Sequence, residues 1–204
     1  MYDPCYHYRS FLSIKPDAES RSILRDINRN FKKYSRNFNF IPLEQLHITL
    51  QFLGNSVSGQ SLSIIEQMIR PIVDNHEPIT ILLDKLNFGF HSQNIAKHLF
   101  FSIEENQQLN HLVKEIHENI KLSPIIDINK KKDHSKLINH LTIARVKGNS
   151  NRSFSREIND FIDRSNFQPI SFEAKEIQII ASKFKENATI YTELISLSLK
   201  QNSI

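Results

Sequence analysis

Cysteine and long apolar runs are scarce in this chain, and each scarcity excludes a class of protein. The 204 residues include one cysteine, Cys5, so the chain can form neither a disulfide framework nor a cluster of thiolate metal ligands. No apolar run approaches the roughly 18 residues that a membrane-spanning helix needs. The first residues, Met1 to Pro4, lack the basic start and apolar stretch of a signal peptide. We therefore expect a soluble protein of the reducing cytoplasm, with no membrane partner.

A strong charge bias and paired carboxylates are also missing. The formal net charge of +4 suits an anionic partner, but many proteins of other kinds carry a similar excess. Aspartate and glutamate occur in no paired arrangement that would favour catalysis by two carboxylates. The four glycines and the many Asn, Ile and Lys residues are typical of an AT-rich genome and are uninformative about chemistry. Hydrophobic residues, 39% of the total, recur along the whole length, so we expect a single folded domain over residues 1–204.

The spacing of apolar residues predicts alternating strands and helices. Apolar residues three or four apart predict four amphipathic helices, at about 18–33, 57–73, 105–121 and 153–164. Alternating and β-prone runs predict strands at 8–14, 46–53, 79–86, 98–103, 138–146, 170–181 and 189–199. This order predicts an α+β fold.

One short motif occurs twice, at positions 93 residues apart. The segment 46–50 (LHITL) reappears as 139–143 (NHLTI), and Gly-Asn-Ser follows each copy, at 54–56 and 148–150. Each half of the chain reads as a strand, a helix, a His-x-Thr strand, a helix and a pair of strands. Such a repeat predicts two similar lobes related by an approximate twofold axis, with both motif strands facing one cleft.

The repeated motif places a histidine and a threonine on the same side of each strand, because strand residues two apart share a face. His47 would point with Thr49, and His140 with Thr142, while their apolar neighbours anchor the opposite face in the core. Two converging imidazoles can take a proton from an attacking water and give one to a departing ribose oxygen. The threonine hydroxyls can hydrogen-bond phosphate oxygens. This chemistry requires no metal and no cofactor.

The structural alternative is that these histidines only fill places in apolar strands, as lone histidines usually do. Nine histidines and five threonines in 204 residues predict about 0.2 His-x-Thr pairs by chance. The chain has two, each within a strand-like apolar frame. The duplication therefore favours a functional pair.

Arg145 carries a positive charge close to the second motif. It follows His140 by five residues, so a regular strand would point the two side chains to opposite faces. A bend or bulge near Ala144 would bring the guanidinium to a phosphate held by the histidines. The alternative is a solvated arginine at the end of a strand.

Three consecutive lysines and two histidines of a predicted helix are further candidates for binding residues. Lys130, Lys131 and Lys132 form a loop that can bind an RNA backbone through its phosphates, although charge runs are usually just solvated. His111 and His117 are six residues apart on a predicted helix, so they do not share a face as metal ligands would. We expect both to be surface residues.

At its two motifs the chain resembles the two-histidine phosphoesterase superfamily, and within it the bacterial and archaeal RNA 2′,3′-cyclic phosphodiesterases, historically called 2′-5′ RNA ligases. The resemblance covers nearly the whole chain: the opening strand, both motif regions and the terminal hairpin, at 9–14, 43–56, 139–147, 172–182 and 191–194. It implies a bilobal α+β fold, in which duplicated β-α-β lobes carry antiparallel sheets that line a central cleft.

The resemblance also implies roles for individual residues. His47 corresponds to the proton donor to the leaving O3′, and His140 to the base that activates water, so the product would be a 2′-phosphate. Arg145 stands where the family commonly has a phosphate-contacting arginine. Two positions depart from the family pattern, since Asn187 stands where the terminal hairpin usually has glycine, and Lys97 where an arginine is often found.

We therefore expect an RNA 2′,3′-cyclic 3′-phosphodiesterase that acts as a monomer on RNA ends or nucleotides with a cyclic phosphate. One alternative is a 2′-5′ oligonucleotide phosphodiesterase that uses the same histidines. Another is a non-catalytic module that binds RNA ends or nucleotides, and such binding would survive the loss of both histidines. Weak 2′-5′ RNA ligase activity would be the reverse reaction, which water disfavours.

Overall fold

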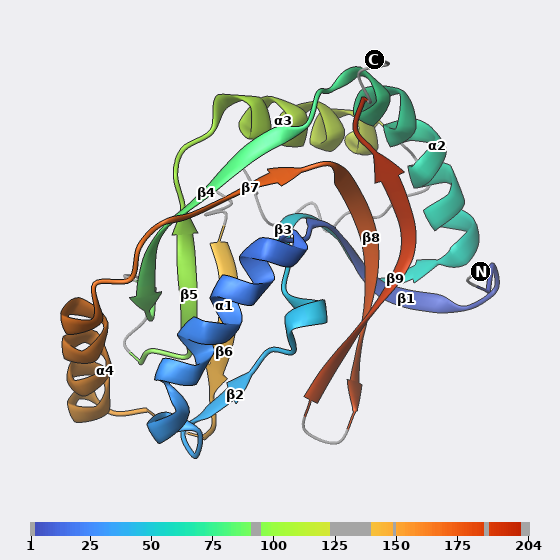
Figure 1. Cartoon of the computed structure of the whole chain (residues 1–204). Coiled ribbons are helices and arrows are strands. Elements are labelled where there is room, and N and C mark those ends of the chain that lie inside the picture. Colours follow the sequence, from blue (N-terminus) through green and yellow to red (C-terminus); the bar gives the residue numbers. More distant parts are fainter. Residues whose placement is uncertain (1–2, 91–94, 123–139, 149, 186–187, 201–204) are drawn as a thin grey trace.

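The computed structural model describes residues 3–90, 95–122, 140–148, 150–185 and 188–200 (Figure 1). Within these residues the helices are α1 (Ala18–Asn30), α2 (Gly59–Asn75), α3 (Gln107–Lys121) and α4 (Arg152–Ser165). The strands are β1 (His7–Ile14), β2 (Phe38–Phe40), β3 (Ile48–Ser58), β4 (Ile79–Phe88), β5 (His98–Ile103), β6 (His140–Val146), β7 (Ile170–Ala174), β8 (Glu176–Lys185) and β9 (Ala188–Ser198). The fold is α+β, as the apolar spacing predicted.

The strands form one antiparallel sheet whose centre is the contact between the two motif strands. Their order is β7-β4-β5-β6-β3-β1-β8-β9, and β2 pairs with β6 beside this path. At the join, Ile48 of β3 pairs with Leu141 of β6. The order is symmetric about this join, since β6 matches β3, β5 matches β1, β4 matches β8 and β7 matches β9. The duplicated, bilobal arrangement predicted from the sequence is confirmed in these two four-stranded halves.

The four helices pack on the two lobes in pairs. In Figure 1, α2 and α3 lie together at the top, where they pack on the lobe that contains β3 and β9. α1 and α4 pack on β7 and β4 of the other lobe. Each lobe is therefore covered by one helix from the first half of the chain and one from the second.

Side-chain caps decide where each helix begins. In all four helices the residue before the first turn accepts a hydrogen bond from a backbone N–H in that turn, and such a cap stabilises a helix by about 1 kcal/mol. These capping residues are Asp17, Ser58, Asn106 and Asn151. Apolar spacing predicts the helices correctly but places three of their starts one or two residues away from the observed first residues.

Three strand predictions need correction. The strand expected to end at residue 53 continues to Ser58, because the Gly-Asn-Ser segment forms an irregularity in the pairing of β3 with β1 and does not end the strand. The run 170–181 is two strands, β7 and β8, which pair with β4 and β1 in opposite lobes. The three-residue strand β2 was missed, since it is too short to show a period. Residues 138–139 of the second motif strand lie outside the described residues.

Apolar neighbours of the motif residues are firmly in the core, as predicted. Five of them are at most 1% exposed and belong to one cluster that spans both lobes: Leu46, Ile48, Leu50, Leu141 and Ile143. The opposite face of each motif strand is therefore held rigidly. None of the helices in the described ranges is long and apolar enough to cross a membrane.

Candidate functional site

The two motif histidines lie beside each other at the join between the lobes. His47 directly precedes β3 and His140 is the first residue of β6. The antiparallel pair at the join is fully buried, so the residues that flank it point to the other face of the sheet. Extending this register by one residue sets each histidine level with the threonine of the other motif: His47 with Thr142, and Thr49 with His140. The two copies of the motif therefore meet at one place in the fold.

A backbone carbonyl fixes the orientation of the His47 ring. Nδ1 of His47 donates a hydrogen bond of 2.7 Å to the backbone oxygen of Gln45, in the short 3-10 helix η2 (Leu43–Gln45). A carbonyl oxygen only accepts, so the hydrogen is on Nδ1, and Nε2 is the nitrogen free to react. The rings of Phe11 and Tyr191 pack against the imidazole, with centroids 4.8 Å and 4.7 Å away. The direction of Nε2 is therefore set before any ligand binds.

Burial lowers the pKa of His47 from 6.5 to about 4, because the imidazolium ion loses its solvation there. The hydrogen bond to Gln45 opposes this change in pKa, and the positive charges of Arg145 and Lys15 add to it. In the free protein His47 is therefore neutral near pH 7. The concentration of positive charge around it favours an anionic ligand.

Two phenylalanines of the lobe that contains β6 form a wall beside His140. The ring of His140 meets Phe90 and Phe100 edge-on, with centroids 5.0 Å and 5.5 Å away. Phe90 and Phe100 stack on each other at 4.3 Å, with their planes 20° apart. Sequence reasoning did not identify this wall, because nothing distinguishes these two among the 14 phenylalanines of the chain.

A bulge in β6 changes which way the end of that strand points. Strand β5 pairs Leu99 with Ala144 but Phe100 with Thr142, so Ile143 is an extra residue in β6. Ile143 and Ala144 are consecutive buried residues, after which the alternation of exposed and buried residues resumes with the opposite parity. The irregularity predicted near Ala144 is therefore present, at the preceding residue.

The bulge puts Arg145 on the same side of the sheet as the histidines. Nη2 of Arg145 donates a hydrogen bond of 3.2 Å to the hydroxyl oxygen of Tyr191, whose ring contacts His47. The charge of Arg145 also lowers the pKa of His47, which places the guanidinium near that ring. The odd spacing between His140 and Arg145 is therefore compatible with one common site.

A third histidine lies next to the pair. His98 is the first residue of β5 and pairs in register with Arg145. Burial lowers its pKa from 6.5 to about 4, and the charges of Arg145 and His140 add to this effect. Among the described residues, its buried Nδ1 has no hydrogen-bond partner. Sequence reasoning missed His98 because it belongs to no repeated motif.

The other residues singled out in the sequence are three lysines and two histidines of α3. Lys130, Lys131 and Lys132 lie outside the described residues, so their proposed contact with RNA stays a prediction. His111 is exposed, as expected. The expectation for His117 was wrong: it is half-buried, with Nδ1 3.0 Å from Oε1 of a buried glutamine of β3.

Comparisons with known proteins found matches along most of the chain. Residues 11–184 match the family model described as the 2′-5′ RNA ligase superfamily. A protein of Methanothermobacter thermautotrophicus described as an RNA 2′,3′-cyclic phosphodiesterase is 25% identical over 187 residues, which are 91% of this chain and 96% of that relative.

Solved structures show the same fold. A crystal structure from Thermus thermophilus superposes with a TM-score of 0.66 and 20% identity, covering 96% of this chain and 100% of that one. E. coli LigT complexed with 3′-AMP gives a TM-score of 0.67 and 19% identity, covering 96% of this chain and 99% of that one.

Proposed function

The chain belongs to the 2′-5′ RNA ligase superfamily of two-histidine phosphoesterases, and from this premise we propose that it hydrolyses 2′,3′-cyclic phosphates of RNA ends or nucleotides to 2′-phosphates. One observation supports this proposal above all others: the two copies of the His-x-Thr motif meet at the join of the sheet, where Ile48 of one copy pairs with Leu141 of the other. The 25% identical relative described as an RNA 2′,3′-cyclic phosphodiesterase agrees with this substrate class.

In the proposed reaction the two histidines transfer one proton each. His140 takes a proton from a water molecule, whose oxygen forms a new bond to phosphorus. The bond between phosphorus and O3′ breaks, and Nε2 of His47 gives its proton to O3′. The products are a 2′-phosphate and a free 3′-hydroxyl, and the proton gained by His140 returns to His47 through solvent. Both proton transfers are supplied by imidazoles, so the proposal includes no metal.

His47 must be protonated in the complex to act as the acid, although it is neutral in the free protein at pH 7. A bound phosphate diester brings a negative charge beside the ring and raises the His47 pKa from its low value in the free protein. The Gln45 carbonyl accepts from Nδ1 in both protonation states, so the ring need not turn when Nε2 gains its proton. Binding of the anion therefore favours the protonated form of His47, which can then act as the acid.

The remaining polar groups would hold the phosphate. We assign Thr49 and Thr142 as hydrogen-bond donors to its non-bridging oxygens, and Arg145 as the cation that stabilises the charge of the transition state. Tyr191 positions Arg145 through the hydrogen bond to its hydroxyl. We further propose that the protein acts as a monomer in the cytoplasm, that Lys130, Lys131 and Lys132 contact the RNA backbone, and that ligation is a weak reverse reaction.

The test is product analysis with a short RNA that ends in a 2′,3′-cyclic phosphate, in buffer with EDTA. We expect a 2′-phosphate product from the wild type and from His7→Ala, a control that removes an exposed histidine of β1. We expect none from His47→Ala or His140→Ala, provided that both variants fold. A 3′-phosphate product would reverse the two proton roles. An RNA left intact by the wild type would refute the proposed activity, and binding that survives both substitutions would favour a non-catalytic module.

A further inference from the structure

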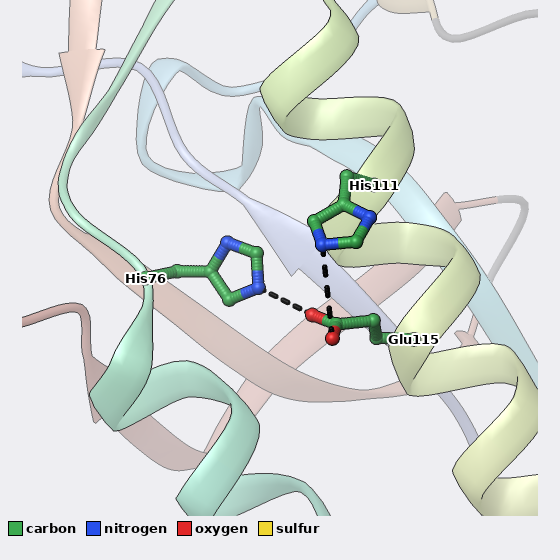
Figure 2. A group of neighbouring side chains, drawn as sticks. All are labelled: His76, His111 and Glu115. Carbon is green, nitrogen blue, oxygen red and sulfur yellow. Dashed lines mark hydrogen bonds and ion pairs between the residues drawn. The ribbon is translucent and has the colours of Figure 1, made fainter.

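A second cluster of histidine and carboxylate side chains lies between α2 and α3 (Figure 2). His76 is the C-terminal cap of α2, while His111 and Glu115 are one turn apart on α3. Figure 2 shows the two imidazoles pointing toward the Glu115 carboxylate, one from the end of α2 and one from α3. The potential ligand atoms of all three side chains lie within 4.8 Å of one another. None of these residues belongs to the proposed catalytic site.

Glu115 contacts both histidines through different oxygens. Its Oε2 lies 2.5 Å from Nε2 of His76, and its Oε1 lies 3.7 Å from Nε2 of His111. The two imidazole centroids are 5.6 Å apart. Together with Pro71, Ile72 and Asn75, the three side chains line a surface hollow of about 380 Å³. The hydrogen bond to His76 comes from another element, and the i,i+4 spacing on α3 adds a second imidazole, that of His111, beside the same carboxylate.

The backbone that carries these side chains is held by other interactions. His111 and Glu115 are four residues apart on a helix and so share a face. The N–H of His76 donates to the carbonyl of Val73 at 3.1 Å, which closes the last turn of α2. The carbonyl of His76 accepts from the N–H of Lys200 at 2.8 Å, so the segment after β9 ties down this helix end. The cluster is therefore largely pre-formed.

We propose that His76, His111 and Glu115 bind one Zn²⁺ ion. Two imidazole nitrogens and one carboxylate oxygen are a donor set that zinc accepts, at bond lengths of about 2.0–2.2 Å. Ligand atoms of a tetrahedral site with such bonds lie about 3.3 Å apart. The contact between Glu115 and His76 therefore lengthens and the wider separations close, which rotation of the three side chains can achieve.

Exposure of the cluster leaves the fourth coordination position to solvent. The side chains of His111 and Glu115 are 66% and 41% exposed, so an ion can enter without a change in the fold and a water molecule can complete the site. The ion would link the end of α2 to the middle of α3, two helices from different halves of the chain. Its expected effect is therefore on the stability of the folded protein, and hydrolysis by the two motif histidines should proceed without it.

Isothermal titration of metal-stripped protein with Zn²⁺ alone tests this proposal. The wild type should bind one ion at the cluster. Binding should weaken at least about tenfold in His111→Ala and in Glu115→Gln, since even the loss of an outer partner of a metal ligand weakens binding by 10–100-fold. The matched control is Glu118→Gln, which removes an exposed carboxylate from the same helix and should bind Zn²⁺ like the wild type. Both test side chains are exposed, so the variants should fold.

A second readout is thermal unfolding. Zn²⁺ at 100 times its Kd should raise the wild-type Tm by roughly 5–10 °C, because a ligand specific for the folded state stabilises it by mass action. The same Zn²⁺ should leave the Tm of His111→Ala and Glu115→Gln almost unchanged. Three outcomes would overturn the proposal: no binding by the wild type, unaltered binding by both variants, or binding that is lost in His47→Ala and His140→Ala instead. EDTA and both cluster variants should leave cyclic-phosphate hydrolysis intact, so each proposal can fail without the other.

Discussion

Arg145 and Tyr191 come from opposite lobes and are joined by a hydrogen bond of 3.2 Å, from Nη2 of the arginine to the hydroxyl oxygen of the tyrosine. The same tyrosine ring packs edge-on against His47. Tyr191 therefore couples the position of the guanidinium to that of one catalytic candidate. A guanidinium has five donors, so this hydrogen bond is compatible with a further contact between Arg145 and an anion.

Removal of the Tyr191 hydroxyl should weaken catalysis through Arg145. We expect Tyr191→Phe to lower kcat/KM for a cyclic phosphate by about tenfold, the lower end of the range for a hydrogen bond to a charged group. The variant keeps the ring that packs on His47. Steady-state kinetics with Tyr6→Phe as control, which alters a tyrosine that is 50% exposed, checks this expectation. An unchanged kcat/KM would show that the hydrogen bond does not position Arg145 for catalysis.

Loss of the Arg145 side chain should slow catalysis more than loss of the Tyr191 hydroxyl. Loss of one preorganised donor to a transition state typically costs about 10²–10³-fold in rate, so we expect that decrease for Arg145→Ala. Arg145→Lys should recover only part of it, because an ammonium group cannot reproduce the planar fork of the guanidinium. Arg156→Ala, on the exposed side of α4, is the matched control and should keep wild-type rates. Equal rates for Arg145→Ala and the control would contradict a phosphate contact.

Binding of phosphate should raise the pKa of His47. In the free protein burial lowers this pKa to about 4. Inorganic phosphate in the site would add negative charge near the imidazole and favour its protonated form. An NMR titration of the His47 ring, with and without saturating phosphate, measures both values. If phosphate binds and leaves the His47 pKa unchanged, His47 is not beside the anion and its role as the acid is wrong.

Acid should destabilise the protein partly through His47. Its pKa is about 4 when folded and about 6.5 when unfolded, so between these values the unfolded chain binds more protons. The stabilising contribution of neutral His47 is complete above pH 6.5 and is lost as the pH falls toward 4. That loss is on the order of 3 kcal/mol for a shift of this size. Urea unfolding of the wild type and His47→Gln at pH 7 and pH 4.5 should show the smaller pH effect in the variant. Parallel losses of stability would refute this contribution.

Phe90 should contribute to binding of a base. Its stack with Phe100 stands beside His140, and stacking of a base on an aromatic ring is worth about 1–3 kcal/mol. We expect Phe90→Ala to raise KM for a nucleoside 2′,3′-cyclic phosphate at least about fivefold. Ribose 2′,3′-cyclic phosphate, which has no base, is the matched control substrate and should show little change. An equal rise in KM for both substrates would mean that Phe90 supports His140 and not the base.

Local sequence patterns predicted much of the fold. Apolar periods of two and of about 3.6 residues predicted the four helices and most strands, because those periods follow directly from backbone geometry. The strand β2 and the division between β7 and β8 escaped prediction for a different reason. Three residues are too few to show a period, and the break at Lys175 arises because the flanking strands pair in different lobes.

The residues of the candidate site that belong to the repeated motif were predictable from the sequence. Those that folding brings in from other segments were not. His47, His140 and their threonines could be found because a duplicated motif is unlikely to arise by chance. His98, Tyr191 and the phenylalanine wall belong to no repeated motif, so no recurring pattern marks them. For the cluster on α2 and α3, the sequence shows His111 and Glu115 one helical turn apart, but His76 is 35 positions before His111 and only helix packing brings it close.

The amino-acid sequence by itself determined the α+β class, the duplication, the family resemblance and the pair of histidines opposite the core-facing side of their strands. Strand periodicity and the repeat can be read directly from the sequence, because neither depends on tertiary contacts. The tertiary structure decided that the two motif strands are neighbours, that a bulge at Ile143 turns Arg145 toward the histidines, and that burial keeps His47 neutral. These features depend on pairing register and on exclusion of water, which are set by residues far away in the chain.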